Sequence, residues 1–272
     1  MSNAGEKLQA LPPMDTSDAA IVATNLTKSY RAVEAVRGIS FAVRRGTTTA
    51  LLGGNGAGKT TTLSMLLGVL TPTGGRVTVL GEAMPEGRAR VLPRMNFTSP
   101  YVDLPKRLTV GENLRVFADL YGLRHPRERI VEVAADCDLG ELLKRPYGSL
   151  SAGQRTRVSL AKAVLNEPEV LLLDEPTASL DPDIGDRMRG YLESYQRRTG
   201  CTMLLASHHM GEVERMCDDV IMLRAGLVVD QGSPQQLIAR YGRETMEEVF
   251  LDIARGREDE RAVGSAAEES TS

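Results

Sequence analysis

The chain has 272 residues, of which 42% are hydrophobic and 25% charged, a balance typical of a globular protein with one large domain or two small ones. Its formal net charge of -3 argues against a protein that binds nucleic acid by neutralising phosphates, so we expect no nucleic-acid partner. The sequence has no apolar run of bilayer-spanning length and no signal-peptide pattern, and its three cysteines lack pairing or metal spacing, which predicts a cytoplasmic protein with reduced thiols.

The beginning of the chain predicts a flexible segment followed by strands. We expect residues 1–18 to form a flexible N-terminus and residues 19–50 to form antiparallel strands. Residues 47–52, TTTALL, are β-branched and apolar, which indicates a buried strand. Residues 60–70 carry leucines at helical spacing, so a strand, a short loop and a helix are predicted in succession.

Between that strand and that helix lies a glycine-rich loop, GGNGAGKT at residues 53–60, which fits G-x-x-x-x-G-K-[ST]. A phosphate chain needs several backbone N–H groups pointing inward, and glycines allow the required dihedral angles without a Cβ in the way. Lys59 would supply a charge for the β- and γ-phosphates and Thr60 a hydroxyl for Mg²⁺. The loop therefore predicts a nucleotide site at a helix N-terminus, where the helix dipole favours anions.

The next segment predicts one more strand and then helices. Residues 76–81 indicate a short strand that closes the sheet begun by residues 19–50. From about residue 88 to residue 165 the pattern is helical. One predicted helix there is amphipathic, with an apolar face formed by Leu114, Phe117, Ala118 and Tyr121.

A second possible anion site lies within that helical stretch, at SLSAGQRTR, residues 149–157. Ser151 is a favourable N-cap, and the residues up to 165 continue as an amphipathic helix. Gly153 leaves backbone N–H groups accessible. The chain thus contains two helix starts suited to phosphate.

Residues 169–176, EVLLLDEP, predict a buried strand that ends in two carboxylates. Ligands of open α/β sheets bind at the carboxyl ends of strands. Asp174 could hold Mg²⁺ through its water shell, and Glu175 could polarise or align an attacking water.

The remaining segments predict a strand followed by two histidines, a hairpin at 221–232 with its turn at Ala225-Gly226, and two C-terminal helices. The second helix should pack through its apolar face, which carries Met246, Val249, Phe250 and Ile253. Residues 257–272 are charged and small, which predicts a disordered tail.

With LSAGQ at 150–154 in place of LSGGQ, and with the phosphate loop and the paired carboxylates, residues 20–235 resemble the nucleotide-binding subunits of ABC transporters. The resemblance implies an α/β fold: a P-loop NTPase core with a mixed sheet, an antiparallel β-subdomain and a helical signature subdomain. It divides the chain into an ATPase domain at 19–235, with its helical subdomain at about 95–165, and a C-terminal helical extension at 236–256.

The resemblance also implies roles for single residues. Tyr30 would stack on adenine, Asp181 would anchor the loop that communicates across a dimer, and His208, in preference to His209, would sense the γ-phosphate. Lys59, Glu175 and His208 are the expected catalytic residues, and Thr60 and Asp174 the expected metal ligands. The expected nucleotide contacts are Tyr30, Gly53, Asn55, Gly56, Ala57, Gly58, Lys59, Thr60, Thr61, Ser99, Ser151, Gly153, Gln154 and Asp181.

One position departs from the family pattern. Family members carry a glutamine in the loop that joins the core to the helical subdomain, but residues 95–114 contain none. Counting back from LTV puts Ser99 or Pro100 at that position. Either a bridging water replaces the amide or Asn96 compensates.

The expected function is MgATP hydrolysis at two composite sites of a head-to-tail homodimer, in which residues 151–154 of one copy complete the site of the other. The chain would lie on the cytoplasmic face of a membrane and drive a separate permease. The ending MEEVFL at 246–251 resembles that of exporter subunits. An importer subunit, a soluble ABC-type ATPase of DNA repair or translation, and a non-hydrolysing nucleotide switch are the alternatives.

Overall fold

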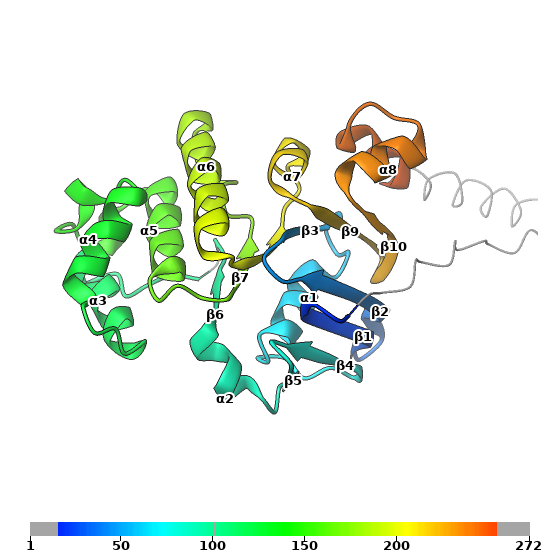
Figure 1. The fold of residues 1–272 in the computed structure, drawn as a ribbon, viewed down its shortest axis with the longest axis horizontal. Coiled ribbons are helices and arrows are strands. Elements are labelled where there is room, and N and C mark those ends of the chain that lie inside the picture. The colour runs from blue at the N-terminus through cyan, green and yellow to red at the C-terminus, as the bar shows by residue number, and fades with distance from the viewer. Residues whose placement is uncertain (1–15, 101, 255–272) are drawn as a thin grey trace, which may run out of the picture.

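The computed structural model describes residues 16–100 and 102–254, arranged as two sheets with helices around them (Figure 1). The flexible N-terminus predicted for residues 1–18 lies almost wholly outside these described residues, and the disordered tail predicted for 257–272 lies entirely outside them. Within the described residues no helix is both long enough and apolar enough to cross a membrane.

The larger sheet has six strands in the order β10-β9-β3-β8-β7-β6, and all neighbours are parallel except β9 and β10. Its strands are β3 (Thr48–Leu52), β6 (Met95–Thr98), β7 (Val170–Asp174), β8 (Thr202–Ala206), β9 (Asp219–Arg224) and β10 (Leu227–Gly232). Strands β3, β7 and β8 are buried at every position because parallel strands are covered on both faces. The prediction of a mixed sheet is confirmed.

The smaller sheet is antiparallel, in the order β2-β1-β4-β5. Its strands are β1 (Ala19–Tyr30), β2 (Val33–Arg44), β4 (Gly74–Val79) and β5 (Glu82–Met84). The antiparallel strands predicted for residues 19–50 are confirmed as far as Arg44, whereas Thr48 and the residues after it belong to the parallel strand β3 of the larger sheet. The strand predicted at 76–81 exists, but it does not close the sheet, because β5 pairs with its outer edge.

Helices cover both faces of the larger sheet. They are α1 (Lys59–Leu66), α2 (Arg88–Val91), α3 (Val110–Leu120), α4 (Pro126–Asp136), α5 (Ala152–Val164), α6 (Pro182–Thr199), α7 (Met210–Met216) and α8 (Pro234–Tyr241). Short 3₁₀ turns lie at Leu92–Arg94, Gly140–Leu142 and Tyr147–Ser149. Residues 246–254 are also helical, and Met246 and Val249 are fully buried there, as the apolar face predicts.

Alternate residues of each central strand face two different cores. Leu171 and Leu173 of β7 belong to the core that includes residues of α3 to α6, whereas Val170 and Leu172 belong to the core shared with α1 and the antiparallel sheet. This alternation follows from the period-2 geometry of a strand. Helix α1 therefore lies between the two sheets, and the helices α3 to α5 gather on the opposite side of the larger sheet (Figure 1).

The structure corrects two predicted elements. Residues 95–98 form the edge strand β6, so the helical stretch predicted from about 88 to 165 is interrupted there, and helices resume with α3 at Val110. Helix α1 ends at Leu66 rather than residue 70, because Gly68 turns the chain with a positive φ of 67°. Helix α8 begins at Pro234.

Candidate functional site

Four loops meet at one edge of the larger sheet. Strands β3, β8, β7 and β6 are consecutive neighbours and parallel, so their carboxyl ends lie at the same edge. The loops that follow them carry residues 53–58, Ser207 and His208, Glu175, and Ser99. The sheet order thus brings together residues that are more than a hundred positions apart in the chain, at the edge where ligands of α/β sheets bind.

The loop after β3 is shaped by its glycines. A Cβ on Gly53 would lie 2.6 Å from the Leu223 carbonyl oxygen, so no larger residue fits there without displacement. Gly58 has a φ of 102° and is the N-cap of α1, where no side chain caps the first amides. Gly54, Asn55 and Gly56 are exposed. The first turn of α1 can therefore accept an anion from outside the chain.

Lys59 folds back onto this loop. Its Nζ donates to the carbonyl oxygens of Gly53, at 2.5 Å, and Gly54, at 3.3 Å. Burial lowers the pKa of the Lys59 ammonium, while the nearby carboxylates of Glu175 and Asp174 act in the opposite direction. The ammonium is thus held in the loop and faces the two carboxylates predicted to share its site.

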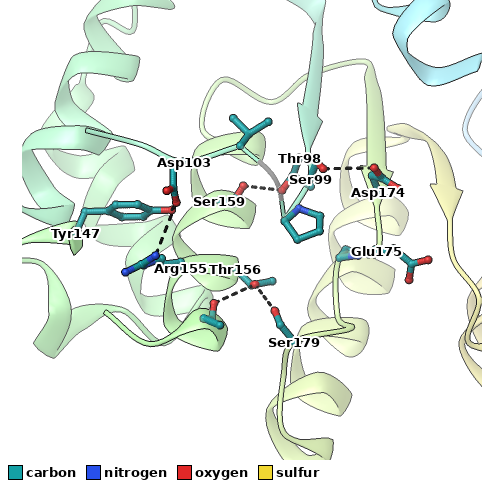
Figure 2. A pocket seen from close by; sticks show the side chains of 14 residues that line it. Thr98, Ser99, Asp103, Tyr147, Arg155, Thr156, Ser159, Asp174, Glu175 and Ser179 are labelled. Carbon is teal, nitrogen blue, oxygen red and sulfur yellow. Dashed lines mark hydrogen bonds and ion pairs between the residues drawn. The ribbon is translucent and has the colours of Figure 1, made fainter. Parts of the chain in front are cut away.

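Asp174 ends β7 and is 4% exposed. Burial raises the pKa of its carboxyl; the hydrogen bond from Ser99 lowers it, Glu175 raises it, and Lys59 lowers it. The Ser99 hydroxyl donates to Oδ2 of Asp174 at 3.3 Å (Figure 2). Ser99 therefore reaches the predicted metal carboxylate directly, without a bridging water.

Asn96 does not compensate for the missing glutamine, and this expectation was wrong. Its amide nitrogen donates to the Ala163 carbonyl and to Oδ1 of Asn166, each at 2.6 Å. The side chain is 5% exposed and ties the edge strand β6 to the end of α5. Its hydrogen bonds are directed into the protein core, away from the carboxyl ends of the strands.

Glu175 has an unusual backbone and a close side-chain partner. Its φ is +50°, a left-handed conformation that a non-glycine residue adopts only where the surroundings impose it. Its Oε1 lies 2.6 Å from Nδ1 of His208, and its backbone N–H donates to the Ala206 carbonyl. A carboxylate paired with an imidazole, at the same sheet edge as a phosphate loop, can align a water molecule and exchange a proton with it.

The two competing histidines occupy different positions. His208 is the one in contact with Glu175, and its side chain is 67% exposed. His209 instead caps α7, where its Nδ1 accepts a hydrogen bond from the backbone N–H of Glu212 at 3.2 Å. The geometry thus favours His208 for a role at the nucleotide.

The second predicted anion site begins α5. Ser151 and Gln154 form a capping box, in which Gln154 N donates to the Ser151 hydroxyl at 3.3 Å and Ser151 N donates to Oε1 of Gln154 at 3.0 Å. The predicted N-cap is confirmed. Gly153 is closely packed: a Cβ added there would lie 3.1 Å from the Ser179 carbonyl oxygen. The outer face of this turn is open, because Ser151 and Ala152 are exposed.

The start of α5 shares a cavity of about 140 Å³ with the two carboxylates: Ala152, Arg155 and Thr156 of α5 line it together with Asp174 and Glu175 (Figure 2). None of the described residues that line this cavity belongs to the Lys59 loop. One chain therefore offers two separated sets of phosphate-binding groups.

Three further predicted nucleotide contacts lie on three different elements. Tyr30 ends β1 and is 47% exposed, with the Lys28 ammonium 5.3 Å from its ring centroid. Asp181 precedes α6 without a capping hydrogen bond from its side chain. Thr61 lies half-buried in the first turn of α1, next to the exposed Thr60.

The oxygen groups of Thr60 and Asp174 suit Mg²⁺, a hard cation that prefers oxygen ligands and usually takes one or two protein groups together with substrate phosphates. The described residues contain no group of three or more His, Cys, Asp or Glu side chains that could hold a metal ion. The residues present fit a magnesium ion bound together with a nucleotide.

Sequence reasoning missed one buried group near these loops. Glu212 on α7 is 2% exposed, and its carboxylate accepts hydrogen bonds from Thr177 and Ser207. The sequence feature that could have revealed it is a glutamate on the same side of a short helix as the apolar residues Met210 and Val213.

Comparisons with known proteins found a matching family and several similar proteins. Residues 36–178 match the family described as ABC transporter. The chain is 39% identical over 233 residues to the Nod factor export ATP-binding protein I of Ralstonia nicotianae, covering 84% of this chain and 71% of that protein. It is 33% identical over 228 residues to the linearmycin resistance ATP-binding protein LnrL of Bacillus subtilis, covering 82% and 72%.

Among solved structures, one described as the ATP-binding subunit of an ABC transporter superposes with a TM-score of 0.80 at 26% identity, covering 86% of this chain and 99% of that one. The cbiO1 subunit from Clostridium perfringens, described as part of the ABC transporter complex cbiONQ, superposes with a TM-score of 0.72 at 30% identity, covering 82% and 91%.

Proposed function

This chain belongs to the ABC transporter family as an ATP-binding and ATP-hydrolysing subunit, and we propose that two copies of it close head-to-tail around two MgATP molecules and drive a separate membrane permease. The observation that carries this proposal is the meeting of the Lys59 loop, Asp174 and the Glu175–His208 pair at one sheet edge. The division into an ATPase domain at 19–235, a helical subdomain and a C-terminal extension at 236–256 remains a prediction.

In this proposal the phosphate loop binds the nucleotide and the carboxylates prepare the water. Lys59 leaves the carbonyls of Gly53 and Gly54 and pairs with the β- and γ-phosphates, beside the amides of residues 55–61. Tyr30 stacks on the base. Glu175 accepts a hydrogen bond from the attacking water and orients it. His208 contacts both the γ-phosphate and Glu175 and so fixes their relative positions.

Thr60 and Asp174 are the residues that would hold magnesium. The ion, when bound, would neutralise phosphate charge and help to orient the γ-phosphate. Ser99 donates to Asp174 and so keeps this carboxylate directed toward the site. Burial of Asp174 limits its hydration, which increases its attraction for a cation.

The second helix start completes the site of the partner copy. Ser151, Gly153 and Gln154 begin α5 with an exposed turn suited to a γ-phosphate, and Asp181 would contact the partner at the loop that follows Glu175. Each nucleotide then satisfies amides on two chains, so ATP would hold the dimer closed and hydrolysis would release it.

We propose export as the direction of transport. The two relatives are named for Nod factor export and linearmycin resistance. The permease partner would hold the chain against the cytoplasmic face of the membrane. The helix at residues 246–254 carries the ending that resembles exporter subunits, packed through Met246 and Val249.

The test is turnover together with assembly. The purified chain should hydrolyse MgATP at a rate that rises faster than linearly with protein concentration. Glu175→Gln should lower turnover at least about 100-fold, the usual range for loss of a general base, and should trap an ATP-bound dimer in size-exclusion chromatography. Glu141→Gln, a change at an exposed carboxylate on a remote 3₁₀ turn, is the matched control. A Glu175→Gln protein that turns over ATP normally, or stays monomeric with MgATP, would contradict the proposal.

A further inference from the structure

The carboxylate of Glu212 is buried on the side of α7 that faces the core, at 2% exposure. Its two oxygens accept hydrogen bonds from two different loops. Oε1 accepts from the Thr177 hydroxyl at 2.8 Å, and Oε2 accepts from the Ser207 hydroxyl at 2.7 Å. Both donors are buried as well, Thr177 at 8% and Ser207 at 0% exposure.

The two loops are those that carry the predicted catalytic residues. Thr177 lies two positions after Glu175 in the loop that follows β7. Ser207 immediately precedes His208 in the loop that follows β8, and its hydroxyl also accepts the backbone N–H of His209 at 3.1 Å. Between the two strand ends the described structure has a backbone hydrogen bond from Glu175 N to the Ala206 carbonyl. Glu212 adds a further connection between the two loops, beside that hydrogen bond and the Glu175–His208 contact.

Burying a glutamate at this position has a cost in desolvation free energy. An apolar side chain of similar volume avoids the desolvation cost of a buried carboxylate and packs equally well. An apolar side chain cannot, however, fix the positions of two hydroxyl groups that belong to separate loops. The carboxylate can, because one rigid plane presents two acceptors at a set separation.

The need for such support is visible at Glu175. Its left-handed φ of +50° is a strained conformation that persists only if its surroundings enforce it. The Glu175–His208 contact of 2.6 Å depends on both loops keeping their positions. Misplacement of a reacting group by about 1 Å can reduce turnover about 100-fold.

We propose that Glu212 is a positioning residue for ATP hydrolysis, which holds the Glu175 loop and the His208 loop in a fixed relation through Thr177 and Ser207. It contacts neither Glu175 nor His208 itself, and it acts on turnover rather than on nucleotide binding. The proposal rests on the proposed function, because it assigns Glu212 a role in the reaction of that site.

Glu212→Ala removes both acceptors and should lower kcat by about 10- to 100-fold, the usual effect of losing a supporting contact, with the Kd for a fluorescent ATP analogue unchanged within about twofold. Glu212→Gln should retain most turnover, since its amide can accept from one hydroxyl and donate to the other. Glu214→Gln is the matched control: it is exposed on the same helix and can still accept the Met246 N–H.

Two measurements separate positioning from a general loss of stability. In a Glu175→Gln background, Glu212→Ala should cause a smaller fractional loss of turnover than in the wild type, because part of its effect acts through the Glu175–His208 contact. Thr177→Val keeps the side-chain shape, removes one hydrogen-bond donor to Glu212 and should also lower kcat. This variant therefore tests the proposal even if Glu212→Ala folds poorly. Wild-type turnover in both Glu212→Ala and Thr177→Val would overturn the proposal, as would an equal fractional loss in the Glu175→Gln background.

A readout without turnover distinguishes failure of this inference from failure of the proposed function. The chain has three histidines, so the ring signals of His208 can be assigned in an NMR spectrum by comparison with His208→Gln. Glu212→Ala should shift the His208 signals and leave those of the remote, exposed His125 in place. Shifted signals in a protein without ATPase activity would contradict the proposed function alone, whereas unshifted signals would contradict the role of Glu212.

Discussion

Oε1 of Glu175 lies 2.6 Å from Nδ1 of His208, although the two residues are 33 positions apart and follow different strands. The contact exists because β7 and β8 are neighbours, with Asp174 opposite Ala206 in the register. Glu175 directly follows Asp174 and His208 lies two residues after Ala206, so both leave the sheet at the same place.

This contact predicts a difference between the two adjacent histidines. His208→Ala should lower ATP turnover by about 100-fold, within the range for loss of a group that positions a proton or a phosphate. His209→Asn should retain turnover, because asparagine can also cap α7. Steady-state ATPase rates of the two variants test this difference. Equal losses of turnover would show that contact with Glu175 does not decide which histidine is needed for ATP hydrolysis.

Lys59 has to exchange the carbonyls of Gly53 and Gly54 for phosphate oxygens when a nucleotide binds. Hydrogen bonds to charged groups contribute about 1.5–3 kcal/mol each, so Lys59→Ala should weaken ATP binding by roughly 10- to 100-fold or more. Lys144→Ala, at an exposed position in the helical part, serves as the control. Equilibrium titration with a fluorescent nucleotide measures both, and an unchanged Kd in Lys59→Ala would contradict the assignment.

Burial of Asp174 predicts a pH-dependent stability effect. Its pKa is raised by burial, so its contribution to folding is fully present below the unfolded value near 3.8 and is lost as the pH rises through the folded pKa. Near pH 7.5 the ionised carboxylate destabilises the nucleotide-free protein. Asp174→Asn should therefore raise the melting temperature there, by roughly 2–4 °C for each kcal/mol of penalty removed.

The same variant should lose that advantage at acid pH, where the wild-type carboxyl is protonated, and should gain less stability from MgATP than the wild type. Thermal melts between pH 4 and pH 8 measure the difference, with the exposed Asp183→Asn as control. A melting temperature of Asp174→Asn below that of the wild type at pH 7.5 would show that burial is not the dominant influence on this carboxyl.

Ser99 is one of the two residues, with Pro100, predicted at the glutamine position, and its hydroxyl donates a hydrogen bond to Asp174 at 3.3 Å. Removing this bond in Ser99→Ala should cost about 1 kcal/mol, which corresponds to an approximately fivefold higher Mg²⁺ concentration for half-maximal turnover. Thr98→Val alters the neighbouring hydroxyl, which pairs with Ser159 instead, and should leave the Mg²⁺ dependence as in the wild type. The same Mg²⁺ dependence in Ser99→Ala and wild type would refute a role for this hydroxyl at the metal.

Local features of this protein followed from its sequence. A strand, a glycine loop and a helix follow one another around residues 53–60. This succession depends on residues that are close in the sequence, because dihedral preferences and side-chain periodicity act over a few residues. The same holds for the Ser151 cap and for the apolar face at 246–253. Asp174 and Glu175 are predictable as well, because an apolar run indicates a buried strand and these two carboxylates stand directly at its end.

Contacts between distant segments were decided only by the tertiary structure. Residues 95–98 became a strand because β7, some 75 positions later, offers a free edge; the same pairing directed Asn96 into the core. The choice between His208 and His209, and the burial of Glu212 against Thr177 and Ser207, depend on which strands are neighbours in the sheet. Strand order is set by the packing of two cores on opposite faces, a global property that no short window of sequence contains.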